Sequence, residues 1–289
     1  MRGLFTAGIL DVMLEEGISF DGVVGVSAGA AFGINFVSGQ KGRTIRYNKR
    51  FAKDWRYCSF RSWLTTGDLF GAQFAYHDVP ERYDPFDSEA FERSTTEFHL
   101  VCTDTETGEA VYKRLTRGGH ETYDWVRASA SMPFVSKPVA LDGKMLLDGG
   151  VADSIPLDYF ECQGFERNVV ILTQPKGYVK QHNRLMPLMR LGLRKYPEMV
   201  KALDCRHNMY NRQLALVEQR EREGAILVIR PAQKLNIGHV SHDPEEMQAI
   251  YDIGKETGKA KIKEIREFIC HNMTSNGVTL TCNSERNTL

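Results

Sequence analysis

Apolar residues recur at helical spacing near the start of the chain and then form a short continuous run. Residues 3–16 carry apolar side chains at the spacing of one helical face and are followed by a glycine, which predicts a helix. Residues 20–26 have the pattern of a buried strand, and residues 28–38 that of a second helix, which ends at another glycine. A strand and a helix joined in this way, here at Ser27, are typical of α/β folds.

Later segments continue the alternation of strands and helices. Residues 97–103 and 109–115 flank a loop of turn-forming residues and predict a pair of strands. Two more strands are predicted at residues 168–173 and 225–231, separated by long helical segments, and residues 243–269 predict a final helix. The alternation predicts a mostly parallel sheet that is covered by helices.

Two segments combine basic, aromatic and apolar residues, and each allows two interpretations. Residues 41–76 begin with several Lys and Arg and continue with aromatic residues, among them Trp55, Trp63 and Phe74. They form either a helical insertion whose aromatic side chains pack inward, or a lid or lipid-facing surface, basic for headgroups and aromatic for the interface. Residues 184–195, a mixture of Met, Leu, Arg and Lys, pose the same choice.

Length and pattern together predict the domain organisation. A chain of 289 residues is long enough for one large α/β domain with a sizeable core. We expect this domain to cover residues 1–270, with a helical insertion at about 41–95 and a C-terminal helical region at about 180–270. Residues 271–289 are polar and without periodicity, so they are expected to be disordered.

Composition limits the kinds of partner and the cellular compartment that we expect for this protein. Lys and Arg together number 37, as do Asp and Glu, so nucleic acid is not expected as a partner. The six cysteines are far apart and lack metal-ligand spacing, which favours reduced thiols without disulfides or zinc. The N-terminal residues lack the pattern of a secretory signal, and no apolar run reaches the ~18 residues of a spanning helix, so we expect a cytoplasmic protein.

Ser27 is the strongest candidate for a catalytic residue. It lies in the middle of Gly25-Val26-Ser27-Ala28-Gly29, between the predicted strand and the predicted helix. A sharp strand-to-helix turn needs glycines on both sides and pushes the serine hydroxyl outward. The following helix directs free N–H groups and its positive end at the same place, which favours a developing oxyanion. The pentapeptide alone is a weak signal, and the strand before it and helix after it make it a candidate nucleophile.

A carboxylate that could act as the base follows a short predicted hairpin. Asp142 and Gly143 make a tight turn, so residues 144–147 can form a strand that delivers Asp148 into the glycine loop Gly149-Gly150. Taken alone, such a tripeptide is usually only a turn. A triad in the order Ser, Asp, His stays open as an alternative. Five histidines follow the aspartate: His182, His207, His239, His242 and His271.

These motifs together resemble the patatin-like phospholipases. Residues 25–29 match the nucleophile elbow of that family, and residues 148–150 match its Asp-Gly-Ala/Gly motif. Residues 128–134 look like its small-residue helix that ends in a proline, and residues 247–254 resemble the closing helix of bacterial members. The resemblance implies a three-layer α/β/α sandwich, and it makes residues 1–270 a patatin-like hydrolase domain.

The resemblance also implies an acyl-ester hydrolase with a Ser–Asp dyad. Ser27 would attack the ester carbonyl, while Asp148 accepts its proton and later activates the water that releases the fatty acid. No metal and no organic cofactor is required. The implied substrate is a lipid or another acyl ester, and transient contact with a membrane surface would make the protein peripheral. Two alternatives stay open: a catalytically silent protein that binds acyl chains, and a soluble carboxylesterase or acyltransferase for small substrates.

The N-terminus departs from the family pattern. The family carries a run Gly-Gly-Gly-x-Arg-Gly after its first strand, and the N–H groups of this run form the oxyanion hole. Arg2 and Gly3 match its last two positions, but the earlier glycines and the strand before them have no counterpart in this sequence. Either translation starts upstream and the sequence is truncated, or the protein is a degraded relative. We expect truncation, because Ser27 and Asp148 both keep their glycines.

Overall fold

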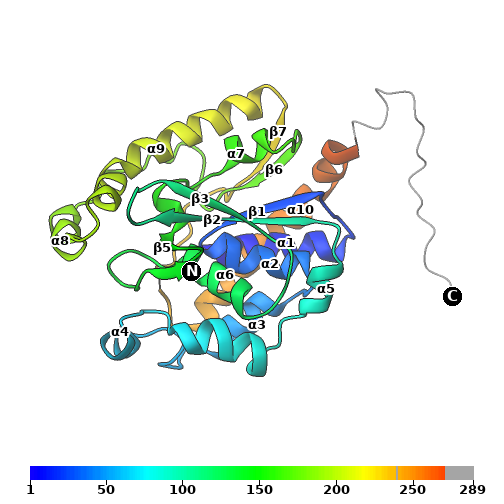
Figure 1. Ribbon diagram of the computed structural model, residues 1–289. Coiled ribbons are helices and arrows are strands. Elements are labelled where there is room, and N and C mark those ends of the chain that lie inside the picture. The colour runs from blue at the N-terminus through cyan, green and yellow to red at the C-terminus, as the bar shows by residue number, and fades with distance from the viewer. Residues whose placement is uncertain (239, 271–289) are drawn as a thin grey trace.

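The computed structural model describes residues 1–238 and 240–270, so the predicted disordered tail lies outside the described residues (Figure 1). At its centre is a five-stranded sheet. Its strands are β1 (Gly22–Val26), β2 (Glu97–Asp104), β3 (Ala110–Leu115), β4 (Val139–Leu141) and β5 (Lys144–Asp148). A second, two-stranded sheet consists of β6 (Asn168–Ile171) and β7 (Ile226–Ile229). All the strands predicted from the sequence are present.

The strand directions differ from the prediction of a mostly parallel sheet. β1 is parallel to β2, and β6 is parallel to β7, but β2 is antiparallel to both β3 and β5, and β4 is antiparallel to β5. The sheet is therefore mixed. The physical reason is the length of two connections, because strands joined by a few residues pair as antiparallel hairpins. Asp142 and Gly143, both at positive φ, form the tighter of these two turns.

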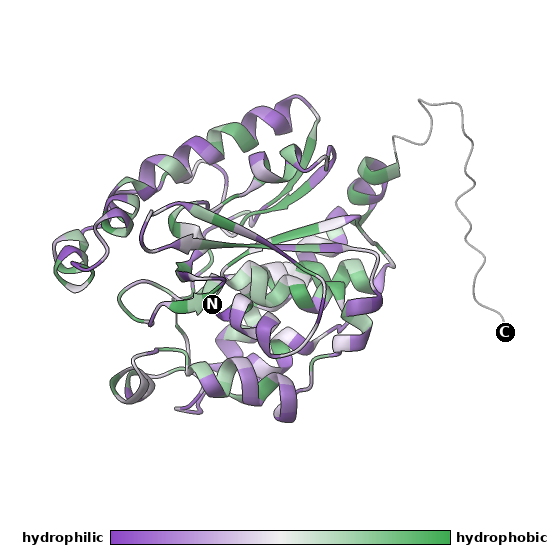
Figure 2. Ribbon diagram, viewed as in Figure 1, coloured by the Kyte–Doolittle hydropathy of each residue, from purple (hydrophilic) through white to green (hydrophobic). Residues whose placement is uncertain are grey.

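Helices cover both sides of the strands and make the three-layer α/β/α fold that the sequence predicts. Helices α7 (Leu157–Cys162) and α9 (Pro197–Arg222) lie on one side, above the strands in Figure 1. The other side is formed by α1 (Gly3–Glu15), α2 (Ala28–Val37), α6 (His120–Ala130) and α10 (Pro244–Cys270). Helix α2 is hydrophobic on most of its surface, as expected for a helix in the interior (Figure 2).

The segment over residues 41–95 is helical. It contains α3 (Arg43–Arg50), α4 (Phe60–Thr66), the π-helix η1 (Phe74–Tyr83) and α5 (Ser88–Arg93). Its aromatic residues divide between the two interpretations: Tyr57 and Phe74 are buried, whereas Trp55 and Phe60 are exposed. The packing interpretation therefore holds for the core of the segment, and α4 presents an exposed aromatic surface.

The register of β2 decides which residues meet at the centre of the molecule. Val26, the last residue of β1, pairs with Val101. The next residue of β2, Cys102, pairs with Asp148 at the end of β5. Because β3 occupies the other edge of β2, strands β1 and β5 lie end to end on one edge. Ser27 and Asp148, far apart in the sequence, are brought together by this arrangement.

Candidate active site

Ser27 lies at a strained turn between β1 and α2. Its φ is 57° and its ψ is −120°, a backbone conformation that non-glycine residues rarely adopt. Gly25 allows the turn, since a Cβ atom there would lie 2.5 Å from the backbone N of Ala30. A Cβ atom on Gly29 would meet no atom within 4 Å. The prediction that glycine is needed on both sides is therefore wrong for Gly29, because a side chain at this position would point into open space.

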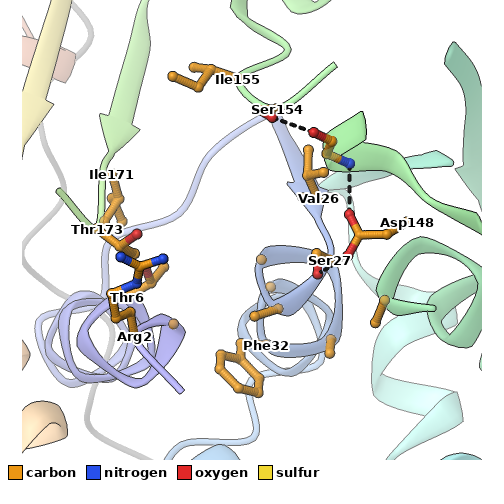
Figure 3. A pocket seen from close by; sticks show the side chains of 18 of the residues that line it. Arg2, Thr6, Val26, Ser27, Phe32, Asp148, Ser154, Ile155, Ile171 and Thr173 are labelled. Atoms are coloured by element: carbon orange, nitrogen blue, oxygen red, sulfur yellow. Dashed lines mark hydrogen bonds between the residues drawn. The ribbon is translucent and has the colours of Figure 1, made fainter. Parts of the chain in front are cut away.

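The Ser27 hydroxyl is hydrogen-bonded to the carboxylate of Asp148. Ser27 Oγ donates to Asp148 Oδ2 over 2.6 Å, and the N–H of Gly150 donates to Asp148 Oδ1 over 2.8 Å (Figure 3). Asp148 is buried, and this burial raises the pKa of its carboxyl above the ordinary value, opposed by the hydrogen bond from Ser27 and the charge of Arg206. A raised pKa makes the carboxylate a stronger base.

The glycines after Asp148 let its loop pack against the central strand. A Cβ atom on Gly149 would lie 2.1 Å from the carbonyl oxygen of Val101, so only glycine fits at this position. The carbonyl of Gly150 accepts hydrogen bonds from Ser154 Oγ and from the guanidinium of Arg206. The loop that carries the Asp148 carboxylate is thus held by β2 on one side and by Ser154 and Arg206 on the other.

Residues that sequence reasoning missed hold Ser27 and Asp148 in place. Ser129 Oγ accepts the N–H of Ser27 over 3.0 Å and donates to the carbonyl of Val101 over 2.6 Å. Thr103 Oγ1 donates to the carbonyl of Asp148 over 2.9 Å. Ser129 belongs to the small-residue stretch noted in the sequence, but nothing in that stretch indicates which backbone group its hydroxyl contacts.

The starts of two helices meet beside Ser27. The N–H of Ser27 is bonded to Ser129, whereas Ala28 and Gly29 begin α2, where the first N–H groups of a helix have no partner within the helix. Gly3, the first residue of α1, packs directly on Ala28, because a Cβ atom on Gly3 would lie 2.8 Å from Ala28 Cβ. The structure therefore brings Arg2 and Gly3 to the wall of the same cavity as the elbow.

Ser27 and Asp148 line a cavity of about 1090 Å³ that separates the two sheets. Residues of β1 form one wall and residues of β6 another. Apolar side chains, including Phe32, Tyr76 and Met189, line much of it. This volume is slightly above the range of about 300–1,000 Å³ that is usual for ligand pockets.

Five cationic side chains line the cavity: Arg2, Arg43, Arg167, Lys180 and Arg206. Of these, Lys180 interacts electrostatically with Arg206 and Arg2. Burial, together with the nearby positive charges of Arg206 and Arg2, lowers the pKa of Lys180 to about 8. Like charges in one cavity repel one another, while Arg206 also interacts with the Asp148 carboxylate. The cluster therefore favours a ligand that carries negative charge.

None of the described histidines is hydrogen-bonded to Ser27. His182 Nε2 lies 2.7 Å from a carboxylate oxygen of Asp204, and His207 Nδ1 donates to the carbonyl of Asp204 over 3.0 Å. His242 Nδ1 donates to the carbonyl of Ala52 over 2.8 Å. The other two histidines considered for a triad, at positions 239 and 271, lie outside the described residues.

The fold and the site define a class: an α/β protein with a serine at a nucleophile elbow, a carboxylate within hydrogen-bonding distance and an apolar cavity. The chain belongs to the patatin-like phospholipase family, whose family model matches residues 1–161. A second family model, described as a domain of unknown function (DUF6363), matches residues 196–269.

Curated relatives include lysophospholipases from fungi. The chain is 24% identical to lysophospholipase NTE1 of Candida glabrata, over 92% of this chain and 16% of that protein. It is 28% identical to the NTE1 of Eremothecium gossypii, over 56% of this chain and 10% of that protein. It is also 28% identical to the uncharacterized protein YjjU of Escherichia coli, over 60% of this chain and 49% of that protein. The chain thus spans half or less of the length of these relatives.

No helix within residues 1–238 and 240–270 has both the length and the apolar content needed to cross a bilayer.

Proposed function

We propose that the protein hydrolyses the acyl ester of phospholipids, with lysophospholipids as the preferred class, through a dyad of Ser27 and Asp148. The observation that supports this most directly is the 2.6 Å hydrogen bond from Ser27 Oγ to the buried Asp148 carboxylate, at the wall of a largely apolar cavity. The names of the fungal relatives, lysophospholipases, agree with the substrate class.

The reaction follows from the positions of the two groups. Ser27 Oγ attacks the ester carbonyl while its proton passes to Asp148 Oδ2, which already accepts that hydrogen bond. The N–H groups of Ala28 and Gly29 stabilise the oxyanion of the tetrahedral intermediate. Asp148 then returns the proton to the leaving glycerol oxygen, which leaves an acyl group on Ser27. Water attacks this acyl-enzyme while Asp148 takes its proton. The bond to Ser27 Oγ then breaks, Asp148 gives the proton to Oγ, and the fatty acid is released.

The cationic residues of the cavity support a phosphate-bearing substrate. Arg2, Lys180 and Arg206 lie on the wall of the cavity that also holds Ser27 and Asp148. Lys180 and Arg206 interact electrostatically, as do Arg206 and Asp148. A phosphodiester near these residues would relieve their mutual repulsion and keep Lys180 charged. A neutral ester has no phosphate for these residues to bind, so they would not increase its affinity.

Exposed apolar residues beside the cavity support contact with a membrane surface. On α4, Phe60 and Leu64 are 65% and 67% exposed, and on α8 (Met186–Gly192) Leu191 is 67% exposed. Both helices lie at the left of Figure 1. Arg and Lys residues at positions 184, 190, 194 and 195 accompany the apolar side chains of α8. An apolar surface with a basic margin is typical of proteins that bind reversibly to anionic interfaces.

The segment between these helices links them to the cavity. Phe134, which lines the cavity, packs against Gly192 at the end of α8. The next residue, Val135, accepts a backbone hydrogen bond of 2.8 Å from Leu69, just after α4. A lipid drawn from the membrane would therefore enter the cavity between two apolar helices that are tied to its wall.

Substrate comparison tests the proposal. The purified protein should release fatty acid from lysophosphatidylcholine faster than from a short, neutral ester, and the Ser27→Ala variant should release none from either. The double variant Phe60→Ser/Leu191→Ser should lose activity on vesicles while keeping activity on monomeric substrate. Saturable fatty-acid binding without turnover by the wild type would contradict the proposal and favour a silent binding protein.

A further inference from the structure

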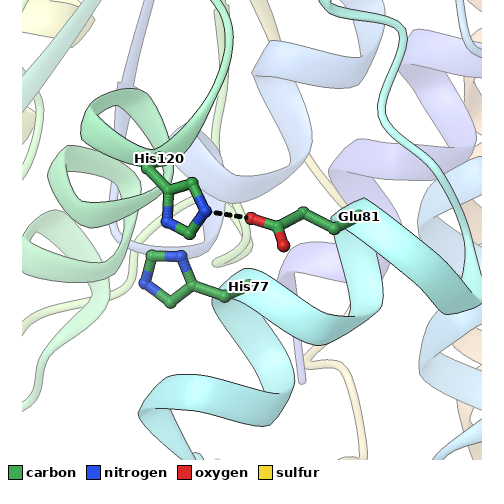
Figure 4. A group of neighbouring side chains, drawn as sticks. All are labelled: His77, Glu81 and His120. Carbon is green, nitrogen blue, oxygen red and sulfur yellow. Dashed lines mark ion pairs between the residues drawn. The ribbon is translucent and has the colours of Figure 1, made fainter.

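A cluster of two histidines and two carboxylates lies outside the catalytic cavity, where η1 packs on α6. His77 and Glu81 come from η1, and His120 and Asp124 from α6 (Figure 4). One ligand atom from each of His77, Glu81 and His120 lies within 4.8 Å of the other two. His120 Nε2 lies 2.8 Å from Glu81 Oε1, and the rings of His77 and His120 are stacked with centroids 4.9 Å apart.

The buried histidine of this cluster has one nitrogen without a partner. Only 7% of His77 is exposed, and its Nε2 lies 3.1 Å from Asp124 Oδ1. Its Nδ1 is buried and has no hydrogen-bond partner among the described residues. Since a carboxylate accepts the proton of Nε2, the lone pair of the neutral ring lies on Nδ1. A buried acceptor of this kind is costly unless it binds something.

The geometry of η1 places its two ligands on one face. η1 is a π-helix, a form that is rare and occurs frequently at functional sites. His77 and Glu81 are four residues apart, about one turn of such a helix, and Figure 4 shows both side chains directed toward His120. His120 and Asp124 are likewise four residues apart on α6. Two facing helices thus each contribute one imidazole and one carboxylate.

We propose that His77, Glu81 and His120 bind a divalent transition-metal ion, with Zn²⁺ as the preferred ion and water as the fourth ligand. Two imidazoles and a carboxylate are a common ligand set for zinc. The Asp124 carboxylate holds His77 in the tautomer that leaves Nδ1 free, which is the usual second partner of a metal-bound histidine. Magnesium and calcium prefer sets made entirely of oxygen ligands, so this set selects against them.

The three ligand atoms could bind one zinc ion after small movements of exposed side chains. Ligand atoms on a tetrahedral zinc ion at about 2.0–2.1 Å lie roughly 3.4 Å from one another. The atoms of the cluster lie within 4.8 Å of one another, so no pair must approach by more than about 1.4 Å, and the 2.8 Å pair of His120 and Glu81 must open by about 0.6 Å. The buried His77 can stay in place, because the side chains of His120 and Glu81 are at the surface and can rotate.

The metal would connect the helical insertion to the helix that supports the catalytic serine. Tyr76, Val79 and Pro80 of η1 line the catalytic cavity, whereas His77 and Glu81 do not. Helix α6 carries Ser129, which accepts the N–H of Ser27. A metal ion bound by both helices would brace this wall of the cavity without contacting the substrate. The cysteine spacing gives no indication of this site, since it contains no cysteine.

Zinc binding to the chelator-treated full chain tests the proposal. A chromophoric zinc competitor should report one Zn²⁺ per chain, and zinc should raise the melting temperature, because a ligand that binds only the folded state stabilises it. His120→Ala and Glu81→Gln should each weaken binding by at least about 10-fold, and Asp124→Asn by about 10–100-fold through His77. His120 is at the surface, so its substitution leaves the fold intact.

Two matched variants serve as controls. His182→Ala removes another exposed histidine that is paired with a carboxylate, and it should bind zinc as the wild type does. Ser27→Ala should also bind zinc normally, which separates this site from the proposed catalytic one. The proposal is overturned if the wild type shows no saturable binding of one zinc ion per chain, or if His120→Ala and Glu81→Gln bind zinc as tightly as His182→Ala.

Discussion

Val26 and Asp148 pair with consecutive residues of β2, at the ends of two strands that run in opposite directions along the same edge of that strand. Ser27 follows Val26 directly, so its hydroxyl meets the carboxylate that ends β5. The proposed dyad is therefore fixed by the register of the central sheet, in addition to the loops that carry its residues. A shift of β5 by one residue would turn Asp148 to the other face of the sheet.

The raised pKa of Asp148 predicts the acid limb of the pH–rate profile. The carboxylate is the active form of the base, so kcat/KM should fall as the pH drops through a midpoint above the ordinary value of 3.8. Burial raises this pKa in the folded state only. The stabilising contribution of protonated Asp148 to the free energy of unfolding is thus fully present below pH 3.8. It is lost as the pH rises through the pKa that Asp148 has in the folded protein.

Urea unfolding at several pH values checks the stability part of this prediction. Asp148→Asn should remove the decline that the wild type shows above pH 3.8, because the amide does not titrate. Equal slopes for the two proteins would mean that the pKa of Asp148 is the same in the folded and unfolded states.

Ser129 should act as a positioning residue. In the Ser129→Ala variant the buried N–H of Ser27 loses its acceptor, so the free energy of unfolding should fall by about 1–3 kcal/mol. The elbow should also relax, and kcat should fall about 10-fold with little change in KM. Ser131→Ala is the matched control, since Ser131 Oγ donates only to a carbonyl of its own helix. Indistinguishable kcat values for the two variants would refute the positioning role.

Lys180 should bind the phosphate of the substrate. Lys180→Met should raise KM for lysophosphatidylcholine by about 10-fold, because the variant loses one charge-assisted hydrogen bond to the phosphate. It should leave KM for a neutral ester unchanged. The pKa of Lys180 is about 8, so the wild-type KM for the phospholipid should rise above that pH as the ammonium loses its proton. The variant should show no such rise. A parallel change in KM for the neutral ester would point to a structural role instead.

The two glycines of the elbow should respond differently to alanine. Gly25→Ala would place Cβ 2.5 Å from the backbone of Ala30, so the turn must open, and both thermal stability and activity should be lost. Gly29→Ala meets no neighbouring atom and should fold with a melting temperature close to that of the wild type. Circular dichroism melting curves measure both. A Gly25→Ala protein as stable as Gly29→Ala would show that the turn tolerates a side chain.

Local signals allowed much of the fold and the positions of Ser27 and Asp148 to be predicted from the sequence. The apolar run before Gly25 and the turn at Asp142 and Gly143 each depend on neighbouring residues, so pattern and turn chemistry indicate them. The mixed sheet was missed because alternating helices and strands suggest parallel crossovers, while the direction of β5 depends on which edge of β2 it joins.

Contacts between distant segments could not be predicted. Ser129 reaches Ser27 from another helix, and His77 reaches His120 only after the insertion has folded onto α6. The open space beside Gly29 likewise depends on the cavity in front of α2. In each case the functional feature is a packing relationship, for which a short stretch of sequence has no signature.

Labelling with a fluorophosphonate probe tests the central claim, that Ser27 is activated by Asp148, most directly. Peptide mapping of the labelled wild type should locate the probe on Ser27, and Asp148→Asn should stay folded but react at least about 10²-fold more slowly. Ser27→Ala should not react. Labelling of Asp148→Asn at the wild-type rate, or a folded wild type that does not react at Ser27, would contradict the account.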